Sequence, residues 1–249
     1  VITLNSNSSV FGVDITGGQN GLYATHVNNL AISDVNVSGT SGDGIQMINV
    51  DGYMMNNVTI SQTGGLGALL QNVNDSMING LTISQTTGSA LYYNCGMNVR
   101  MSGLNVDATG ATDDAVRIHT QTNAVFTNFD IRNSTHNGLS IGSSTIVKFD
   151  QIKLTDVLGN GLQTDQSGTF TFAHLNMTNI GGTGLVLNNT PLVSVDNSVF
   201  TNVTNVIGYL NTEYYISGSG NVATGQTTLF TGTTTGGSIQ FTTPNATAP

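Results

Sequence analysis

Acidic, basic and histidine side chains gather in one short stretch of this chain. Asp113 and Asp114 are adjacent, Arg117 and His119 follow them closely, and His136 comes somewhat later. Two carboxylates near a histidine suit glycoside hydrolysis, in which one carboxylic acid protonates the leaving oxygen and the other carboxylate activates water or attacks the sugar. If the chain is an enzyme, we expect Asp113, Asp114 and His136 to be catalytic.

A repeat of 23 residues must position these side chains. Six of the seven intervals between coil starts are 23 residues, and the remaining one, which begins at Ala90, is 25. Each coil starts at a small residue: Gly21, Gly44, Gly67, Ala90, Ala115, Gly138, Gly161 and Gly184. A fixed period of this length predicts a solenoid, in which each coil buries its apolar face by stacking on its neighbours. The two extra residues of the long coil are expected beside Asp113 and Asp114.

Apolar residues within each coil alternate as they do in strands. Counted from the small residue that starts each coil, they fall at positions 2 and 4, 10 and 12, and 15 and 17. No helical stripe competes with this pattern. The step from 12 to 15 predicts a corner, which is occupied by residues that tolerate left-handed backbone: Asn56-Asn57, Asn79-Gly80, Thr127-Asn128 and Asp196-Asn197. We therefore predict an all-β, single-stranded parallel helix of about nine coils over residues 1–210, with three short strands per coil. The register weakens after Asn205, so residues 211–249 are expected to form an atypical cap or linker.

Positions 3 and 5 of each coil point outward from the first strand and form one face. Substrate-binding candidates occupy it in four of the coils: Gln71, Tyr92, Arg117, His119 and Asp165. Stacking of equivalent positions also offers a purely structural interpretation. Asp114 shares a turn position with Asn137 and Asn160 and can belong to a ladder of polar side chains. Four further charges can pair between adjacent coils in the same way, Asp107 with Arg132 and Asp130 with Lys153.

Composition limits the partners and cofactors of the chain. The net charge of -9, with 8% charged residues, argues against nucleic acid and anionic membranes as partners, and no apolar run is long enough to span a membrane. Cys95 is the single cysteine, so no internal disulfide forms, and no Cys/His spacing suggests zinc. We expect no cofactor; calcium stays an alternative, although it needs more oxygen ligands than Asp113 and Asp114 supply. The chain starts at Val1 without Met, which suggests a segment of a larger protein with neighbouring domains.

The repeat resembles the right-handed parallel β-helix superfamily, which includes pectate lyases, polygalacturonases, epimerases, phage tailspikes and adhesin passengers. Residues 113–118, Asp-Asp-Ala-Val-Arg-Ile, resemble the Asp-Asp motif of polygalacturonases, and residues 136–143 resemble their Gly-His-Gly-Leu-Ser-Ile-Gly-Ser motif. The resemblance implies acid and base roles for Asp113 and Asp114 and a supporting role for His136. The chain departs from that pattern, because His136 is displaced by one residue, residues 161–164 replace an expected Arg-Ile-Lys, and no Asn-Thr-Asp precedes the aspartates.

Three functions follow as hypotheses, because this scaffold hosts many activities. The missing motif elements favour a non-catalytic module of a bacterial autotransporter or adhesin-like passenger, located outside the cell or on its surface, whose polar face binds a polysaccharide or cell-surface glycan. The first alternative is a polysaccharide-active enzyme, a hydrolase, lyase or epimerase, with its site around Asp113 and Asp114. The second alternative is a phage or structural fibre.

Overall fold

The computed structural model describes residues 1–166, 168–190, 192–225 and 228–241. In these residues the chain forms strands and turns without a helix, and thus no helix there could cross a membrane. The strands are β1 (Ile2–Leu4), β2 (Ser9–Thr16), β3 (Leu22–Ser38), β4 (Ile45–Thr63), β5 (Ala68–Asn74), β6 (Met77–Thr86), β7 (Leu91–Met97), β8 (Arg100–Asp107), β9 (Val116–Ser134), β10 (Leu139–Gly142), β11 (Thr145–Val157), β12 (Leu162–Asp165), β13 (Thr169–Ala173), β14 (Asn176–Asn188), β15 (Leu192–Asp196), β16 (Val199–Gly218), β17 (Val222–Thr224) and β18 (Thr228–Phe241).

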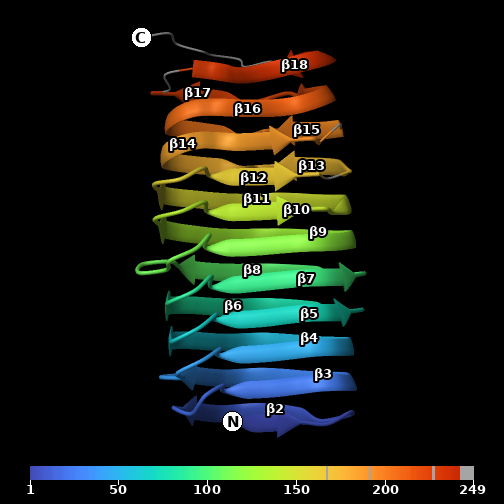
Figure 1. The fold of residues 1–249 in the computed structure, drawn as a ribbon, viewed down its shortest axis with the longest axis vertical. Helices are drawn as coiled ribbons and strands as arrows, with labels where there is room; N and C mark the ends of the chain where they lie inside the picture. The colour runs from blue at the N-terminus through green and yellow to red at the C-terminus, as the bar shows by residue number, and fades with distance from the viewer. Residues whose placement is uncertain (167, 191, 226–227, 242–249) are drawn as a thin grey trace.

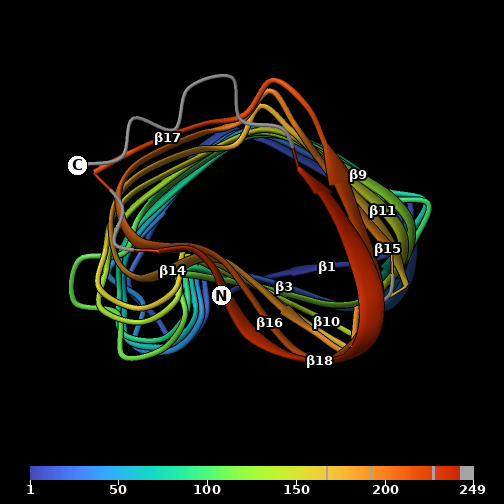
Figure 2. The same ribbon diagram turned by 90° about the horizontal axis from the view of Figure 1, so that it is seen from above.

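Successive coils pair in parallel with the register that the repeat predicts. Leu22 of β3 pairs with Ile45 of β4, and Ile45 pairs in turn with Ala68 of β5. The coils stack from the N-terminus to the C-terminus (Figure 1) and superimpose around one interior when viewed along the stack (Figure 2). The predicted all-β parallel solenoid of about nine turns is confirmed.

The corners are made by residues with positive φ. In the Gly44 coil, Asn49, Gly52, Asn57 and Gln62 adopt φ between 50° and 70°. These bends allow the three pairing segments of that coil to run on as one continuous strand, β4. The predicted corner at Asn57 is confirmed, and Asn128 adopts the same backbone conformation. Asparagine suits such corners because its short polar side chain tolerates the left-handed region.

The interior is apolar and closely stacked. Side chains at the predicted inward positions are buried from Leu22 to Ile207, and burial of such side chains is the main stabilising contribution to the fold. Phe126, Phe149 and Phe172 stack along the axis, with ring centroids 5.0 and 5.5 Å apart. Since the inward positions are fixed by this packing, the alternate positions on each strand must face solvent.

The parallel ladder continues past residue 210. Strand β16 runs across that position and pairs in parallel with β18, with register shifts between Leu210 and Glu213. The role of residues 211–249 as a cap or linker stays a prediction, and residues 226–227 and 242–249 lie outside the described residues.

The two extra residues of the long coil lie earlier than expected. Asp107 still pairs with Arg132 in register, and the Thr112 N–H donates to the carbonyl oxygen of Thr87, so the insertion falls at Thr109 and Gly110. It forms the loop that projects to the left of β8 in Figure 1. The Asp107 carboxylate anchors it by accepting hydrogen bonds from the N–H and the hydroxyl of Thr109, at 3.2 and 2.6 Å. The expectation that the insertion lies directly beside the two aspartates is therefore corrected.

Candidate functional site

Three of the predicted binding residues meet on the outward face of strands β7 and β9. Tyr92 on β7 is the register partner of Arg117 on β9, and His119 lies two residues beyond Arg117 on the same face. The guanidinium carbon of Arg117 lies 5.1 Å from the centroid of the Tyr92 ring. The His119 ring meets the Tyr92 ring edge-on, with centroids 5.9 Å apart. These are the geometries of a cation–π contact and an aromatic edge contact.

Asp113 belongs to the same group of side chains. Its Oδ2 lies 2.7 Å from Arg117 Nη1, and its Oδ1 accepts the backbone N–H of Asp114 at 2.9 Å. Both carboxylate oxygens are therefore engaged. The ion pair is partly exposed and contributes on the order of 0.2–1 kcal/mol to stability, so it orients Arg117 more than it stabilises the fold.

Asp114 belongs to a ladder that repeats along the solenoid. Its Oδ1 accepts the Asn137 N–H at 3.0 Å, Asn137 Oδ1 accepts the Asn160 N–H at 2.9 Å, and Asn160 Oδ1 accepts the Thr183 N–H at 2.9 Å. Asp43 makes the equivalent bond several coils earlier. The predicted ladder is confirmed, and it gives Asp114 a structural role that asparagine fills in the next two coils.

His136 lies in the turn stacked above Asp113 but is exposed to solvent. Its Nδ1 lies 3.1 Å from the hydroxyl oxygen of Thr135, and no hydrogen bond or ion pair joins it to Asp113 or Asp114 among the described side chains. The structure therefore places the three predicted catalytic residues in adjacent turns without joining His136 to the aspartates. A catalytic role for these residues stays a prediction.

His119 is the most strongly perturbed side chain of the face. Burial lowers the pKa of its imidazole, and the Arg117 charge lowers it further, while Asp114 and Asp165 act in the opposite direction. Together these effects favour the neutral form of the imidazole. Its Nε2 is buried and has no hydrogen-bond partner. A neutral, half-exposed imidazole is suited to exchanging a proton with a bound molecule.

Gly142, which the sequence analysis did not single out, makes room for His119. The two residues are register partners on β9 and β10, and a Cβ at Gly142 would lie 2.7 Å from His119 Nδ1. A signal was present in the sequence, because Gly142 is the single glycine among the residues at position 5 of the eight coils: Thr25, Ile48, Gln71, Asn94, His119, Gly142, Asp165 and Asn188.

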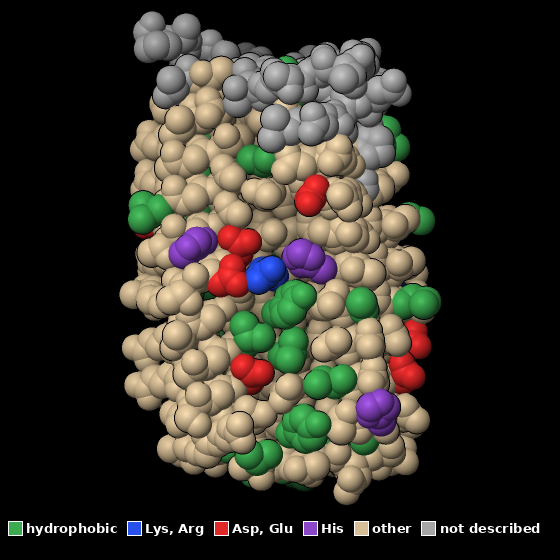
Figure 3. All heavy atoms as spheres, in the orientation of Figure 1, with side chains coloured by type: hydrophobic (Ala, Val, Ile, Leu, Met, Phe, Trp, Pro, Cys, Tyr) green, Lys and Arg blue, Asp and Glu red, His purple; other side chains and the backbone are tan. Residues whose placement is uncertain are grey.

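Gln71 and Asp165 flank the cluster at a distance. Gln71 lies two strands before His119 in the register, and Asp165 lies two strands after it. At ~4.8 Å per strand, each is about 10 Å from His119 along the axis. Figure 3 shows this face, with a basic side chain among acidic and histidine side chains and hydrophobic side chains toward the N-terminal coils. The face could thus contact an extended ligand across several coils.

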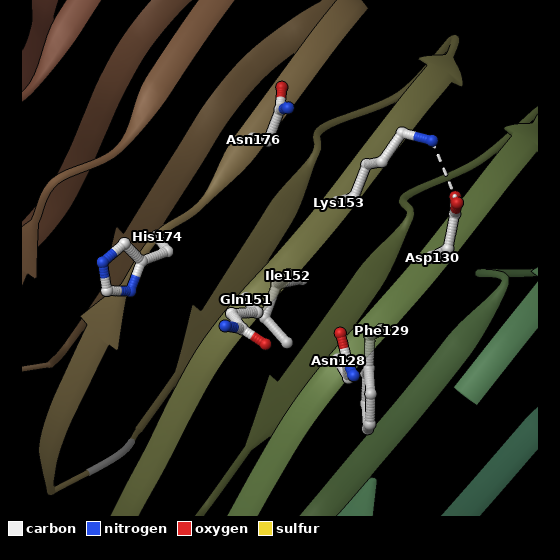
Figure 4. Close-up of a pocket in the computed structure, with 8 residues that line it drawn as sticks. All are labelled: Asn128, Phe129, Asp130, Gln151, Ile152, Lys153, His174 and Asn176. Atoms are coloured by element: carbon white, nitrogen blue, oxygen red, sulfur yellow. Dashed lines mark hydrogen bonds and ion pairs between the residues drawn. The ribbon is translucent and has the colours of Figure 1, made fainter. Parts of the chain in front are cut away.

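A separate hollow of about 280 Å³ lies at the corner between the second and third strands, and Figure 4 shows side chains of three successive coils around it. Lys153 Nζ lies 2.9 Å from Asp130 Oδ2 there. The other predicted pair between coils, Arg132 with Asp107, is also present, with Nε and Oδ2 3.3 Å apart. Both predicted pairs are confirmed, and the hollow contains none of the predicted site residues.

Among the described residues, no three His, Cys, Asp or Glu side chains come together in a way that could hold a metal ion. Calcium at Asp113 and Asp114 stays a prediction, because calcium also takes backbone and amide oxygens.

Comparisons with known proteins bear on the fold. A family model described as a right-handed β-helix region matches residues 1–112. The fold is a right-handed parallel β-helix. No curated protein matches the sequence significantly. Solved structures resemble the β-helix at low sequence identity, which establishes a common fold alone.

Three solved structures illustrate the likeness. The A-module of the mannuronan C-5 epimerase AlgE4 from Azotobacter vinelandii superimposes with a TM-score of 0.72 at 12% identity, over 96% of this chain and 85% of that one. The catalytic domain of a GH87 α-1,3-glucanase, in complex with tetrasaccharides, gives 0.64 at 10% identity, over 97% and 55%. Tailspike protein 2 of the Escherichia coli O157:H7 bacteriophage CAB120 gives 0.51 at 12% identity, over 94% and 32%.

Proposed function

We propose that this β-helix is a polysaccharide-active protein whose substrate lies across Tyr92, Arg117 and His119 and carries carboxylate groups. The similar solved structures include an epimerase and a glucanase, which favours the enzyme alternative over the non-catalytic module that the sequence favours. The observation that carries the proposal is the contact of an aromatic ring, a guanidinium and a half-buried imidazole whose pKa is lowered, on one outward face.

Each of the three side chains has a distinct role. Arg117 pairs with the carboxylate of a uronic acid unit, since guanidinium binds carboxylate through two parallel hydrogen bonds. Neutralising that carboxylate makes the proton on the adjacent carbon more acidic, because negative charge develops there as the proton leaves. His119, which is neutral, accepts this proton, and the Tyr92 ring packs against the sugar. The reaction class is therefore proton abstraction, as in a lyase or an epimerase.

Hydrolysis by Asp113 and Asp114 fits the geometry less well. A hydrolase needs one carboxylic acid that donates a proton and one carboxylate that acts on water or sugar. Asp113 uses both oxygens for Arg117 and the Asp114 N–H, and Asp114 accepts the Asn137 N–H. Three of the four carboxylate oxygens are therefore already engaged in hydrogen bonds of the fold.

Binding without turnover is the second candidate. The structural hydrogen bonds of Asp113 and Asp114 favour it, and a phage tailspike is among the similar structures. In this version the β-helix is a glycan-binding module of an adhesin-like passenger or fibre, outside the cell or on its surface, within a larger chain. The same face would bind the glycan.

The test is a panel of polysaccharides with alginate, polygalacturonate and a neutral glucan. Lyase products are followed by the absorbance of their unsaturated ends, epimerisation by NMR, hydrolysis by reducing ends, and binding by calorimetry. We expect turnover of a polyuronate that is lost in Arg117→Gln and retained in Asp114→Asn, because asparagine keeps the acceptor of the ladder.

The other outcomes are distinct. Polyuronate binding without turnover would establish the second candidate, and hydrolysis that Asp114→Asn abolishes would restore the aspartate mechanism. If the protein neither binds nor turns over any polyuronate, the proposal is wrong.

A further inference from the structure

The corner directly behind His119 is polar where earlier coils are apolar. Gln121 is fully buried and occupies the coil position that is taken by buried Val27, Val50 and Val73 in earlier coils. An amide taken out of water at such a place destabilises the fold unless its hydrogen bonds are made. The Gln121 Nε2 makes its hydrogen bonds, whereas its Oε1 is buried without a partner, so the donor contacts show what this exception to the repeat achieves.

Gln121 joins three coils at the back of the site. Its Nε2 donates to the carbonyl oxygen of His119 at 2.9 Å and to that of Tyr93, the neighbour of Tyr92, at 3.4 Å. Its backbone N–H donates to the Ser144 hydroxyl at 3.1 Å. One side chain thus holds the main chain beside both rings of the Tyr92–His119 contact.

The neighbouring backbone is adapted to this side chain. Gly96 is the register partner of Gln121, and a Cβ at Gly96 would overlap Gln121 Oε1. Thr120, between His119 and Gln121, has φ of 53°, which is a strained conformation for a β-branched residue. The hydrogen bonds on either side of Thr120 hold this corner in place.

We propose that Gln121 is a positioning residue that fixes His119 against Tyr92 and Gly142. The positioning of His119 by Gln121 is argued from these contacts alone, while an effect of Gln121 on activity rests on the proposed function. If the Gln121 amide is lost, the carbonyl oxygens of His119 and Tyr93 lose their shared donor, the corner relaxes, and the His119 ring becomes more exposed to water.

The groups around His119 determine the direction in which its pKa should change when Gln121 is replaced. Burial and Arg117 lower its pKa, and Asp114 and Asp165 oppose them, with the Tyr92 ring covering one side. Exposure to water removes the largest of these effects, which is burial. The pKa of His119 should therefore rise toward the ordinary value when the ring is no longer held.

The experiment compares Gln121→Met with Ser198→Ala. Methionine keeps the volume of Gln121 but cannot donate. Ser198 is also buried and hydrogen-bonded, to the Leu175 N–H and the Asp196 carbonyl oxygen, and lies several coils away. The imidazole titrations are followed by proton NMR, with the His119 signal assigned from its absence in His119→Gln.

Both variants are expected to lower the melting temperature. Only Gln121→Met should raise the pKa of His119, and it should lower kcat/KM on a polyuronate roughly tenfold or more through misplacement of the ring. If Gln121→Met does not fold, Ser144→Ala removes the acceptor of the Gln121 N–H together with the hydrogen bond from the Ser144 hydroxyl to the Gly142 carbonyl oxygen, and a smaller shift in the same direction is expected.

An unchanged His119 titration in the folded variant would overturn the positioning role, whatever the activity. A shifted His119 titration in a protein that neither binds nor processes polyuronate would leave the positioning role standing and remove the proposed function. The two proposals can therefore fail separately.

Discussion

Charged residues lie on two faces of this β-helix, and they are arranged differently. On the third-strand face, Asp107 pairs with Arg132 and Asp130 with Lys153, each between adjacent coils at equivalent positions. On the first-strand face, Arg117 takes its partner Asp113 from its own coil. The register partners of Arg117 are Tyr92 and Ser140, which carry no opposite charge.

The charges on the third-strand face pair between equivalent positions of adjacent coils, whereas Arg117 pairs with a residue at a different position of its own coil. Both faces keep buried polar atoms without partners, His119 Nε2 on one and Asp130 Oδ1 on the other, so unpaired atoms do not distinguish them. The combination of a half-buried imidazole, a guanidinium and an aromatic ring occurs on the first face. We therefore expect substitutions there to change activity, and substitutions on the third face to change stability alone.

The largest expected effect is on turnover. His119→Gln removes the proposed proton acceptor and should lower the rate on a polyuronate by ~10²–10⁴-fold, with little change in melting temperature. Asp130→Asn, on the third face, is the matched control and should retain the rate. Initial rates with both variants check this, and equal rates would erase the distinction between the two faces.

Gly142→Ala should affect both stability and the site. The new methyl group would meet the His119 ring, and relieving the contact should cost ~1–3 kcal/mol in the free energy of unfolding. Ser140→Ala, on the same outward side of β10, is the control and should unfold like the native protein in urea. A Gly142→Ala variant of native stability would mean that the ring moves aside freely.

Asp107 should make stability depend on acid pH. Partial burial alone would raise its pKa, but hydrogen bonds from Thr109, Asn133 and Arg132 outweigh burial and lower the pKa to about 2, from 3.8. Because the folded-state pKa is the lower one, the stabilisation is present above about pH 4 and is lost as pH falls toward 2.

After allowance for solvent screening, this contribution is about 1 kcal/mol. Asp107→Asn should therefore lower the melting temperature at pH 6 and leave it nearly unchanged at pH 2. Thermal unfolding of both proteins across this range measures the difference, and a constant difference at every pH would show that the charge of Asp107 is not involved.

The smallest effect is expected from the Asp130–Lys153 pair. Both side chains are substantially exposed, so Lys153→Met should change the free energy of unfolding by less than about 1 kcal/mol. High salt should remove what difference there is, because mobile ions screen exposed charges. A larger effect that persists in salt would show that this face contributes more than a stacked pair does.

The repeat predicts the features that depend on the position of a residue within its coil. Positions such as Leu22 and Phe149 were assigned inward and Tyr92 and Arg117 outward, and stacking predicted the partners of Asp107 and Asp130. These predictions succeed because coils at a constant period must pair in parallel at a constant register. The position of the insertion was wrong because small and polar residues around Thr109 give no period to follow.

The sequence by itself determined the β-helix, its register and the face on which the candidate site lies. The tertiary structure decided which side chains on that face meet: Arg117 contacts Asp113 and Tyr92, Asp114 completes a ladder, and His119 packs over Gly142. The physical reason is that a period assigns each residue a place and a direction. Contact, burial and protonation depend on side-chain conformations and on charges from several coils, which no single repeat contains.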